Sequence, residues 1–339
     1  MQTLSPVKAA EREIFMDVLR GFAILGIFIA NLGSGFSGYN ESAHATIKRR
    51  LVFMLLLGAI HLLIWTGDIV FFYALLGFLL LPCRKFSNKT LLVTGITLIV
   101  LPILLYAAKS QWHWLNAPSD LLFSTGQKLD LKLTGITSEA EYFEYAKHAN
   151  WWDILKGNIS GFFFRYGYLF FVSRIPKVLG MFLIGYVLGR SDFYKNIAQN
   201  KKIIYWIIGL GLLIGLPANF YLARYMTYFS NDYWSMKIKG LYQTIFYALG
   251  VVPLAMAYVG IFMLSFQSNA GKKLMSVLTP VGKMAFSNYF LQSLVGNFVF
   301  LGPGLGLTGT IGPFYYTFFG IGFFIIQIII STIWLKYFN

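Results

Sequence analysis

The chain has 339 residues, of which 57% are hydrophobic and only 12% charged. This composition excludes an ordinary soluble protein and indicates a polytopic membrane protein. The single cysteine excludes an intramolecular disulfide framework, and the four scattered histidines offer no metal-ligand spacing, so we expect no metal. The net charge of +15 is spread in short basic groups between apolar runs, which is typical of membrane topology and argues against a nucleic-acid partner.

The apolar runs predict an all-α fold, an integral membrane helical bundle of about nine spans, if about 20 residues cross a bilayer and shorter helices are allowed. An aromatic run over residues 159–173 is interrupted by arginine, and we expect it at the membrane interface. The nine predicted spans cover residues 14–32, 51–65, 69–81, 90–108, 175–188, 203–222, 241–266, 284–301 and 314–334.

Three regions follow from this pattern. Residues 1–108 form N-terminal membrane helices with a polar hairpin, 109–157 an extracytoplasmic polar loop, and 158–339 the C-terminal membrane helices. Within the loop, Ser138 and Glu141 have the spacing of a capping box, which predicts a short helix over residues 140–148.

The hairpin carries the first candidate site. His61 is the only histidine inside a strongly apolar run, and Asp68 lies at the tip between the two helices. An ionisable side chain at membrane depth costs about 2.5–3.5 kcal/mol, so it needs a partner, a wet cavity or a function. A histidine oriented by a carboxylate is the minimum equipment of a general base. A neutral imidazole bonded to a neighbouring helix, with Asp68 in the headgroups, is the structural alternative.

Polar residues also interrupt the first predicted span. Asp17 and Arg20 are three residues apart and share a helix face, where they can neutralise each other. Asn31 lies eleven residues further on, about 16 Å along a helix axis and near its other end. The pair can fix helix packing or bind a substrate, and both interpretations stay open.

A second polar row occupies the late segment of the chain. Asn288 and Gln292 are four residues apart on one helix face, and Ser293 and Asn297 continue the row less well aligned. In lipid such amides usually hold helices together, at about 0.6–2 kcal/mol each. A substrate-binding row is the sharper alternative.

Basic residues orient the chain. They gather before and after the hairpin and in two later turns, whereas the hairpin tip and the Gly-rich turn of residues 302–313 contain none. The positive-inside rule therefore places that tip and that turn outside and the C-terminus inside. Nine spans then require an N-terminus outside.

Three blocks of sequence carry a resemblance to a known family. They are MDVLRG at residues 16–21 closing on Asn31, HLLIWTGDI at 61–69 with Tyr73-Ala74-Leu75, and VGKMAFSNYFLQS at 281–293 followed by GLGL at 304–307. Together these blocks resemble the YeiB-like family of bacterial membrane proteins, known as domain of unknown function 418. That family usually has a further span before the hairpin, so the chain is expected to be shortened between Asn31 and Lys48.

The first block is distantly similar to transmembrane acyltransferases, which move acyl groups from cytoplasmic donors to acceptors across the membrane. The resemblance implies that Arg20 contacts the phosphates of an acyl-coenzyme A donor. Asn31 stands where the O-acyltransferases carry a histidine and cannot transfer a proton. His61 is then the best candidate for the general base, with Asp68 orienting it, and His44 is the second candidate.

Two functions remain. The first is acyl transfer from a cytoplasmic donor to an envelope glycan or lipid, in a multi-pass protein of the bacterial inner membrane, with no bound cofactor. The second is transport or export of a small molecule or lipid, with Asp17, His61 and Asp68 as a proton relay. The sequence shows no internal repeat of the kind common in transporters, which favours the enzyme. A homo-oligomer is neither required nor excluded.

Overall fold

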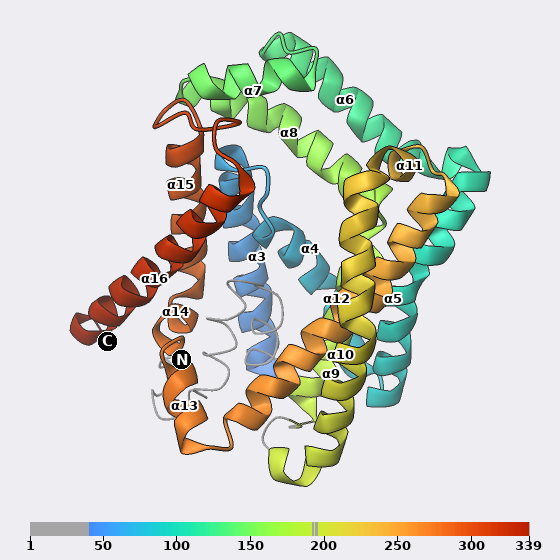
Figure 1. Cartoon of the computed structure of the whole chain (residues 1–339), viewed down its shortest axis with the longest axis vertical. Coiled ribbons are helices and arrows are strands. Elements are labelled where there is room, and N and C mark those ends of the chain that lie inside the picture. The colour runs from blue at the N-terminus through green and yellow to red at the C-terminus, as the bar shows by residue number, and fades with distance from the viewer. Residues whose placement is uncertain (1–40, 192, 194–195, 339) are drawn as a thin grey trace.

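The computed structural model describes residues 41–191, 193 and 196–338, and this part of the chain is helical without a strand, as predicted (Figure 1). The elements are α3 (Glu41–Ile64), α4 (Val70–Leu80), η2 (Pro82–Lys85), α5 (Asn88–Gln111), η3 (His113–Asn116), α6 (Ala117–Leu133), α7 (Glu139–His148), α8 (Trp151–Phe171), α9 (Arg174–Arg190), α10 (Ile197–Tyr228), α11 (Ser230–Trp234), α12 (Ile238–Ser265), α13 (Asn269–Ser276), α14 (Thr279–Lys283), α15 (Ala285–Phe300) and α16 (Pro313–Tyr337).

Four helices, α5, α10, α12 and α16, are long and apolar enough to cross a membrane. The pair α8 and α9 adds a fifth if it counts as one broken span, because its two helices meet at 72°. The predicted spans at the hairpin and at residues 284–301 coincide with α3, α4 and α15, but these helices do not meet the same criterion. The count of nine therefore stays a prediction, and the span over residues 14–32 lies outside the described residues.

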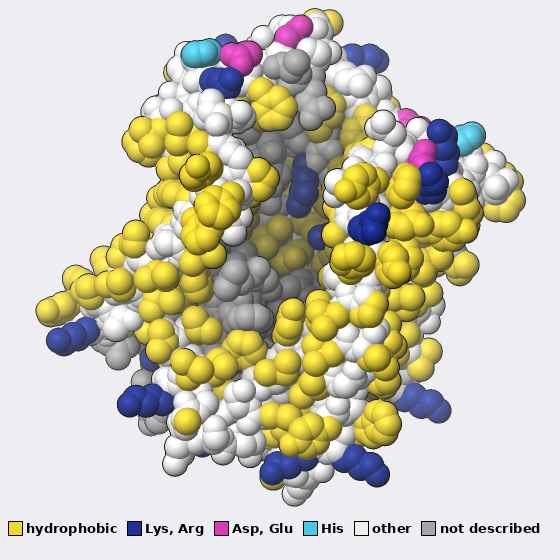
Figure 2. All heavy atoms as spheres, viewed as in Figure 1, with side chains coloured by type: hydrophobic (Ala, Val, Ile, Leu, Met, Phe, Trp, Pro, Cys, Tyr) yellow, Lys and Arg dark blue, Asp and Glu magenta, His cyan; other side chains and the backbone are white. Residues whose placement is uncertain are grey.

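The outer surface is that of a protein embedded in hydrocarbon. On the face drawn in Figure 2, hydrophobic side chains form a broad band across the middle, and most of the charged side chains lie toward the two ends. Helix α16 shows the band in detail, since Phe318, Ile325 and Ile329 are each more than half exposed. Soluble proteins rarely expose an apolar surface of this extent to water. The described helices thus define a membrane protein.

Small residues let the membrane helices approach closely. A Cβ at Gly211 of α10 would lie 2.5 Å from the carbonyl oxygen of Pro253 in α12. A Cβ at Gly180 of α9 would lie 2.5 Å from the carbonyl oxygen of Gly95 in α5. These contacts hold α10 against α12 and α5 against α9.

The bend between α8 and α9 has an identifiable cause. Ser173 adopts a left-handed backbone (φ 50°), which ends α8. The Lys109 ammonium of α5 is 7% exposed and donates hydrogen bonds to the carbonyl oxygens of Phe170 (2.7 Å) and Phe171 (3.0 Å). A cation at the C-terminus of a helix satisfies the last carbonyls and complements the helix dipole. The bend is therefore fixed by a side chain from another helix.

The segment predicted as a polar loop is mostly helical. Helix α6 packs along α8, where Gly126 faces the ring of Phe164 and Gly167 faces that of Phe123. The sequence analysis did not predict α6, because this helix mixes polar and apolar residues and is too polar to span a membrane. The capping prediction is confirmed: the Ser138 hydroxyl accepts from the Glu141 amide at 3.3 Å, and α7 begins at the next residue.

Candidate functional site: a polar junction between the hairpin and α15

The hairpin brings the two predicted residues of the first site together. Helix α3 ends at Ile64 and α4 begins at Val70, and the two helices touch so closely that a Cβ at Gly58 would overlap the backbone nitrogen of Phe71. The short turn then returns Asp68 toward the last turns of α3. His61 and Asp68 are therefore hydrogen-bonded. The sequence pattern alone did not predict that their side chains would be in contact.

The imidazole of His61 bridges two groups. Its Nδ1 lies 2.8 Å from Oδ1 of Asp68, and its Nε2 lies 2.6 Å from the Oγ of Ser293 on α15. His61 is fully buried, with 0% of its surface exposed, and Asp68 is 2% exposed. A carboxylate at one ring nitrogen and a serine hydroxyl at the other is the arrangement of a Ser-His-Asp triad.

Both oxygens of the Asp68 carboxylate accept hydrogen bonds. Besides His61, it accepts a hydrogen bond from the Tyr289 hydroxyl (3.1 Å) and one from the Phe71 amide (2.7 Å). Since the carboxylate only accepts, Nδ1 of His61 carries a proton. Nε2 faces the Ser293 hydroxyl, which also donates to the carbonyl oxygen of Phe290 at 2.9 Å. We call His61, Asp68, Tyr289 and Ser293 the junction.

Two amide side chains hold the end of α3 in place. Asn297 of α15 donates to the carbonyl oxygen of Ile64, and Asn158 of α8 donates to that of Leu63, both at 2.7 Å. The ring of Phe290 packs on the imidazole of His61 with centroids 4.2 Å apart. The last carbonyls of a helix have no partner within it, so these amides satisfy groups that lipid could not. The junction is therefore rigid.

The predicted amide row faces another way. The Asn288 side chain donates to the Ser331 hydroxyl (2.9 Å), and that of Gln292 donates to Oε1 of Gln327 (2.7 Å). Ser331 and Gln327 belong to α16 and are completely buried. Asn288 and Gln292 thus hold α15 against α16, as in the structural interpretation of the row. Ser293 and Asn297, the less well aligned members of the row, face α3 instead.

Sequence reasoning did not assign Ser293 and Tyr289 to His61. The available signal was their spacing, since Tyr289, Ser293 and Asn297 recur every four residues and share a helix face. Successive residues in a helix are about 100° apart, so this stripe lies beside the amide row and faces α3 instead of α16.

The remaining predicted residues do not join the junction. Asp17, Arg20 and Asn31 lie outside the described residues. His44 lies in α3 seventeen positions before His61, or about 25 Å along the helix axis, toward the opposite end of α3. Among the residues that the structure describes, no group of three or more His, Cys, Asp or Glu could hold a metal ion.

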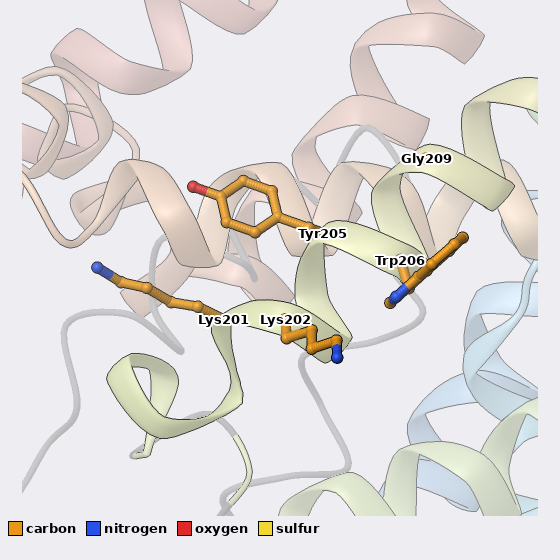
Figure 3. A pocket seen from close by; sticks show the side chains of 5 residues that line it. All are labelled: Lys201, Lys202, Tyr205, Trp206 and Gly209. Carbon is orange, nitrogen blue, oxygen red and sulfur yellow. The ribbon is translucent and has the colours of Figure 1, made fainter.

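One recess lined by described residues has no junction residue in its lining. A shallow recess of about 510 Å³ lies on the first turns of α10, where Figure 3 shows Lys201 and Tyr205 extending to one side and Trp206 to the other. Lysine and aromatic side chains at the end of an apolar helix are typical of the membrane interface. The recess is also lined by Lys202 and Gly209.

Fold and site together define a helical membrane protein with a buried imidazole held between a carboxylate and a hydroxyl. The family model described as protein of unknown function (DUF418) matches residues 188–339. YxaH of Bacillus subtilis (strain 168) is 30% identical to the chain, over all of it and 94% of YxaH. YeiB of Escherichia coli (strain K12) is 25% identical, over 96% of the chain and 80% of YeiB.

The chain therefore belongs to the DUF418 family, and the predicted resemblance to YeiB is confirmed. The match with YxaH extends over 403 aligned positions, more than the 339 residues of this chain, so YxaH carries segments with no counterpart here. No solved structure matches.

Proposed function

We propose that the protein transfers an acyl group, with His61 as general base and Asp68 as the residue that orients it. The observation that carries the proposal is the bridging imidazole, with the Asp68 carboxylate at Nδ1 and the Ser293 hydroxyl at Nε2. A carboxylate in this position fixes the tautomer and stabilises the imidazolium that forms when Nε2 takes a proton. The same geometry recurs on unrelated folds, so it is recognised by roles and not by sequence order.

The chemistry proceeds in two steps. His61 takes the Ser293 proton as Oγ attacks the carbonyl carbon of a thioester donor, and the thiolate leaves with that proton. An acceptor hydroxyl then gives its proton to His61 and attacks the serine ester, and Ser293 is regenerated with the proton returned. The first step forms a C–O bond to Ser293 and breaks the C–S bond of the thioester. The second forms a C–O bond to the acceptor and breaks the C–O bond of the serine ester, so no oxidant or reductant is needed.

The donor in this proposal is an acyl-coenzyme A and the acceptor a hydroxyl of an envelope glycan or lipid. Because the hairpin tip with Asp68 is predicted outside and the donor is cytoplasmic, a long donor or a deep cavity has to bridge the distance to the junction. The support is the similarity of the first sequence block to transmembrane acyltransferases, together with the membrane character of the described helices. On the face shown in Figure 2, only Lys and Arg mark the lower end, whereas acids and bases mix at the upper end. This asymmetry supports a multi-pass protein of the inner membrane with its lower end in the cytoplasm.

The test uses membrane vesicles containing the full-length protein, radiolabelled acetyl-coenzyme A and envelope extract. His61→Ala is expected to lower label transfer by about 100-fold or more, because general-base catalysis contributes about 10²–10⁴-fold. The matched control is His148→Ala, because the His148 side chain is 81% exposed on α7 and should leave transfer unchanged. Equal transfer by wild type and a folded His61→Ala protein rules the proposed base out.

Ser293→Ala separates the two roles of the hydroxyl. Loss of transfer comparable to that of His61→Ala supports a covalent route through Ser293. Transfer retained in Ser293→Ala but lost in His61→Ala means that the acceptor itself occupies the position at Nε2, and the covalent step is wrong.

The transport alternative draws on the same contacts. Tyr289, Asp68, His61 and Ser293 form a continuous chain of hydrogen bonds, which also suits proton movement. Proton-coupled uptake into vesicles without acyl donor, abolished by Asp68→Asn, supports the relay. Stabilisation of the detergent-solubilised protein by coenzyme A supports the enzyme.

A further inference from the structure

A group of cations lies where α8 meets α9, away from the polar ends of the molecule. Lys177 of α9 is only 4% exposed, and its ammonium lies 3.8 Å from the centre of the Tyr247 ring on α12. The Arg174 guanidinium lies 5.5 Å from the same ring centre and donates to the Tyr247 hydroxyl. One aromatic side chain therefore contacts two cations from the first turns of α9.

A third cation joins them from α8. Arg165 and Arg174 both lie within electrostatic range of the Tyr73 hydroxyl on α4. The ring of Tyr166, next to Arg165 in the chain, lies 6.1 Å from that of Phe71, whose amide donates to Asp68 of the junction. We call Arg165, Arg174 and Lys177 the cation cluster, which lies between α4, α8, α9 and α12 and borders the junction.

The positive charges of the cluster are not balanced by negative side chains within the described part of the chain. None of its three cations forms a salt bridge there, and Asp68, the nearby carboxylate, is already occupied by His61, Tyr289 and Phe71. Nε of Arg165 and the hydroxyl of Tyr166 are buried without a hydrogen-bond partner in this same part. Buried charges are normally paired, because an isolated one costs several kcal/mol or shifts its protonation.

Two of the three cations can be reached from the surface. Arg165 and Arg174 are half-buried, so a charged group of a ligand can contact them. On the face drawn in Figure 2 the molecule is hollowed between the side of α15 and α16 and the side of α10 and α12, and Lys or Arg side chains lie on its wall. Elsewhere in the apolar band of this face, hydrophobic side chains dominate.

We propose that the cation cluster binds a phosphate group. Two guanidinium groups offer planar pairs of N–H donors that match phosphate oxygens, Lys177 adds a point charge, and the Tyr166 hydroxyl adds a neutral donor. Three positive charges suit a phosphate with up to two negative charges better than a single carboxylate. Tyr73, Tyr166 and Tyr247 surround the site with rings, which suits a phosphate carried on an apolar chain.

Thermal melting of the detergent-solubilised full-length protein tests the site with two probes, inorganic phosphate and dodecyl phosphate, against sodium chloride at equal ionic strength. Stabilisation by either phosphate supports the site. A rise in Tm with dodecyl phosphate alone identifies a lipid-like source, and a rise with both identifies free phosphate. A Tm that responds to neither probe overturns the proposal.

Variants assign the effect to the cluster. Arg165→Met and Lys177→Met should each weaken phosphate binding about tenfold or more, since a hydrogen bond to a charged group contributes about 1.5–3 kcal/mol. Lys202→Met is the matched control, because Lys202 is exposed on α10 and distant from the cluster in sequence. Equal weakening by the control would show a nonspecific charge effect and contradict the site. His61→Ala should leave phosphate binding intact, so this inference stands or falls separately from acyl transfer.

Discussion

The junction is buried and the cation cluster is partly buried, and these two polar groups differ in how far their charges are matched. In the junction, each oxygen of Asp68 has a donor, and both ring nitrogens of His61 have a partner. In the cation cluster, Arg174 and Lys177 share the Tyr247 ring, Nε of Arg165 has no hydrogen-bond partner, and the described residues offer the three cations no carboxylate.

This difference shows that the charges of the junction are satisfied by protein groups alone, whereas those of the cation cluster are not. A satisfied buried network rigidifies the fold and can hold reactive groups in a fixed geometry. A buried cluster of like charges stores unfavourable energy that a ligand of opposite charge can relieve. Substitutions that remove polarity should therefore act with opposite signs in the two places.

The largest effect is expected for Asp68→Ala. Loss of the carboxylate leaves the His61 imidazole, the Tyr289 hydroxyl and the Phe71 amide without their acceptor. Breaking a buried polar network in this way should lower the free energy of unfolding by about 3–5 kcal/mol. Chemical denaturation in detergent measures it, with the exposed Asp120→Ala in α6 as control. A loss below that of the control would mean that the junction does not stabilise the hairpin.

A second way to break the junction acts through the backbone. Gly58→Ala places a methyl group against the backbone nitrogen of Phe71, the same nitrogen that donates to Asp68. Overpacking of this kind costs about 1–3 kcal/mol of stability. Gly296→Ala in α15 is the matched control, because a Cβ there meets no atom within 4 Å. Two equally stable variants would contradict the close approach of α3 and α4.

Lys177→Met tests the comparison at the cation cluster. Removing a buried cation without a carboxylate partner should raise the free energy of unfolding by about 1–2 kcal/mol when no phosphate is present, since apolar replacements of buried charges are often stabilising. Thermal melting in phosphate-free buffer measures the sign. A lower Tm would show that Lys177 is already compensated, and the contrast between the two clusters would disappear.

The smallest effect lies at α7, far from both clusters. The Thr137 amide donates to the Glu141 carboxylate at 2.7 Å, and this bond lowers the pKa of Glu141 below its ordinary value. A lowered pKa stabilises the cap above the unfolded pKa, and the contribution is lost as the pH falls through the folded pKa. Hydrogen exchange of the Thr137 amide, corrected for intrinsic rates, should rise at acid pH. Glu141→Gln should remove that pH dependence, and an unchanged profile would contradict the cap.

The sequence predicted some of these features for clear physical reasons. Apolar runs, the Ser138 cap and the hairpin turn are local signals, and they located α4, α5, α9, α12, α15 and α16 within a few residues. Helix α3 begins earlier than its predicted span, and α6 was not predicted. The scarcity of ionisable side chains in apolar runs singled out His61 and Asp68.

Other features depend on helix packing and were out of reach. The contact between His61 and Ser293 joins residues 232 positions apart. Which stripe of α15 faces α3 follows from the rotation of that helix, and no local pattern fixes it. The cations of α8 and α9 were interpreted as breaks in an aromatic run because their meeting depends on the bend at Ser173.

The most direct measurement of the central claim is peptide mass spectrometry of the full-length protein after brief incubation with acetyl-coenzyme A and rapid acid quenching. If the junction is catalytic, the peptide containing Ser293 gains one acetyl group in the wild type and in His148→Ala, but not in His61→Ala. An unmodified Ser293 in the wild type, together with transfer activity that survives Ser293→Ala and His61→Ala, would contradict the account.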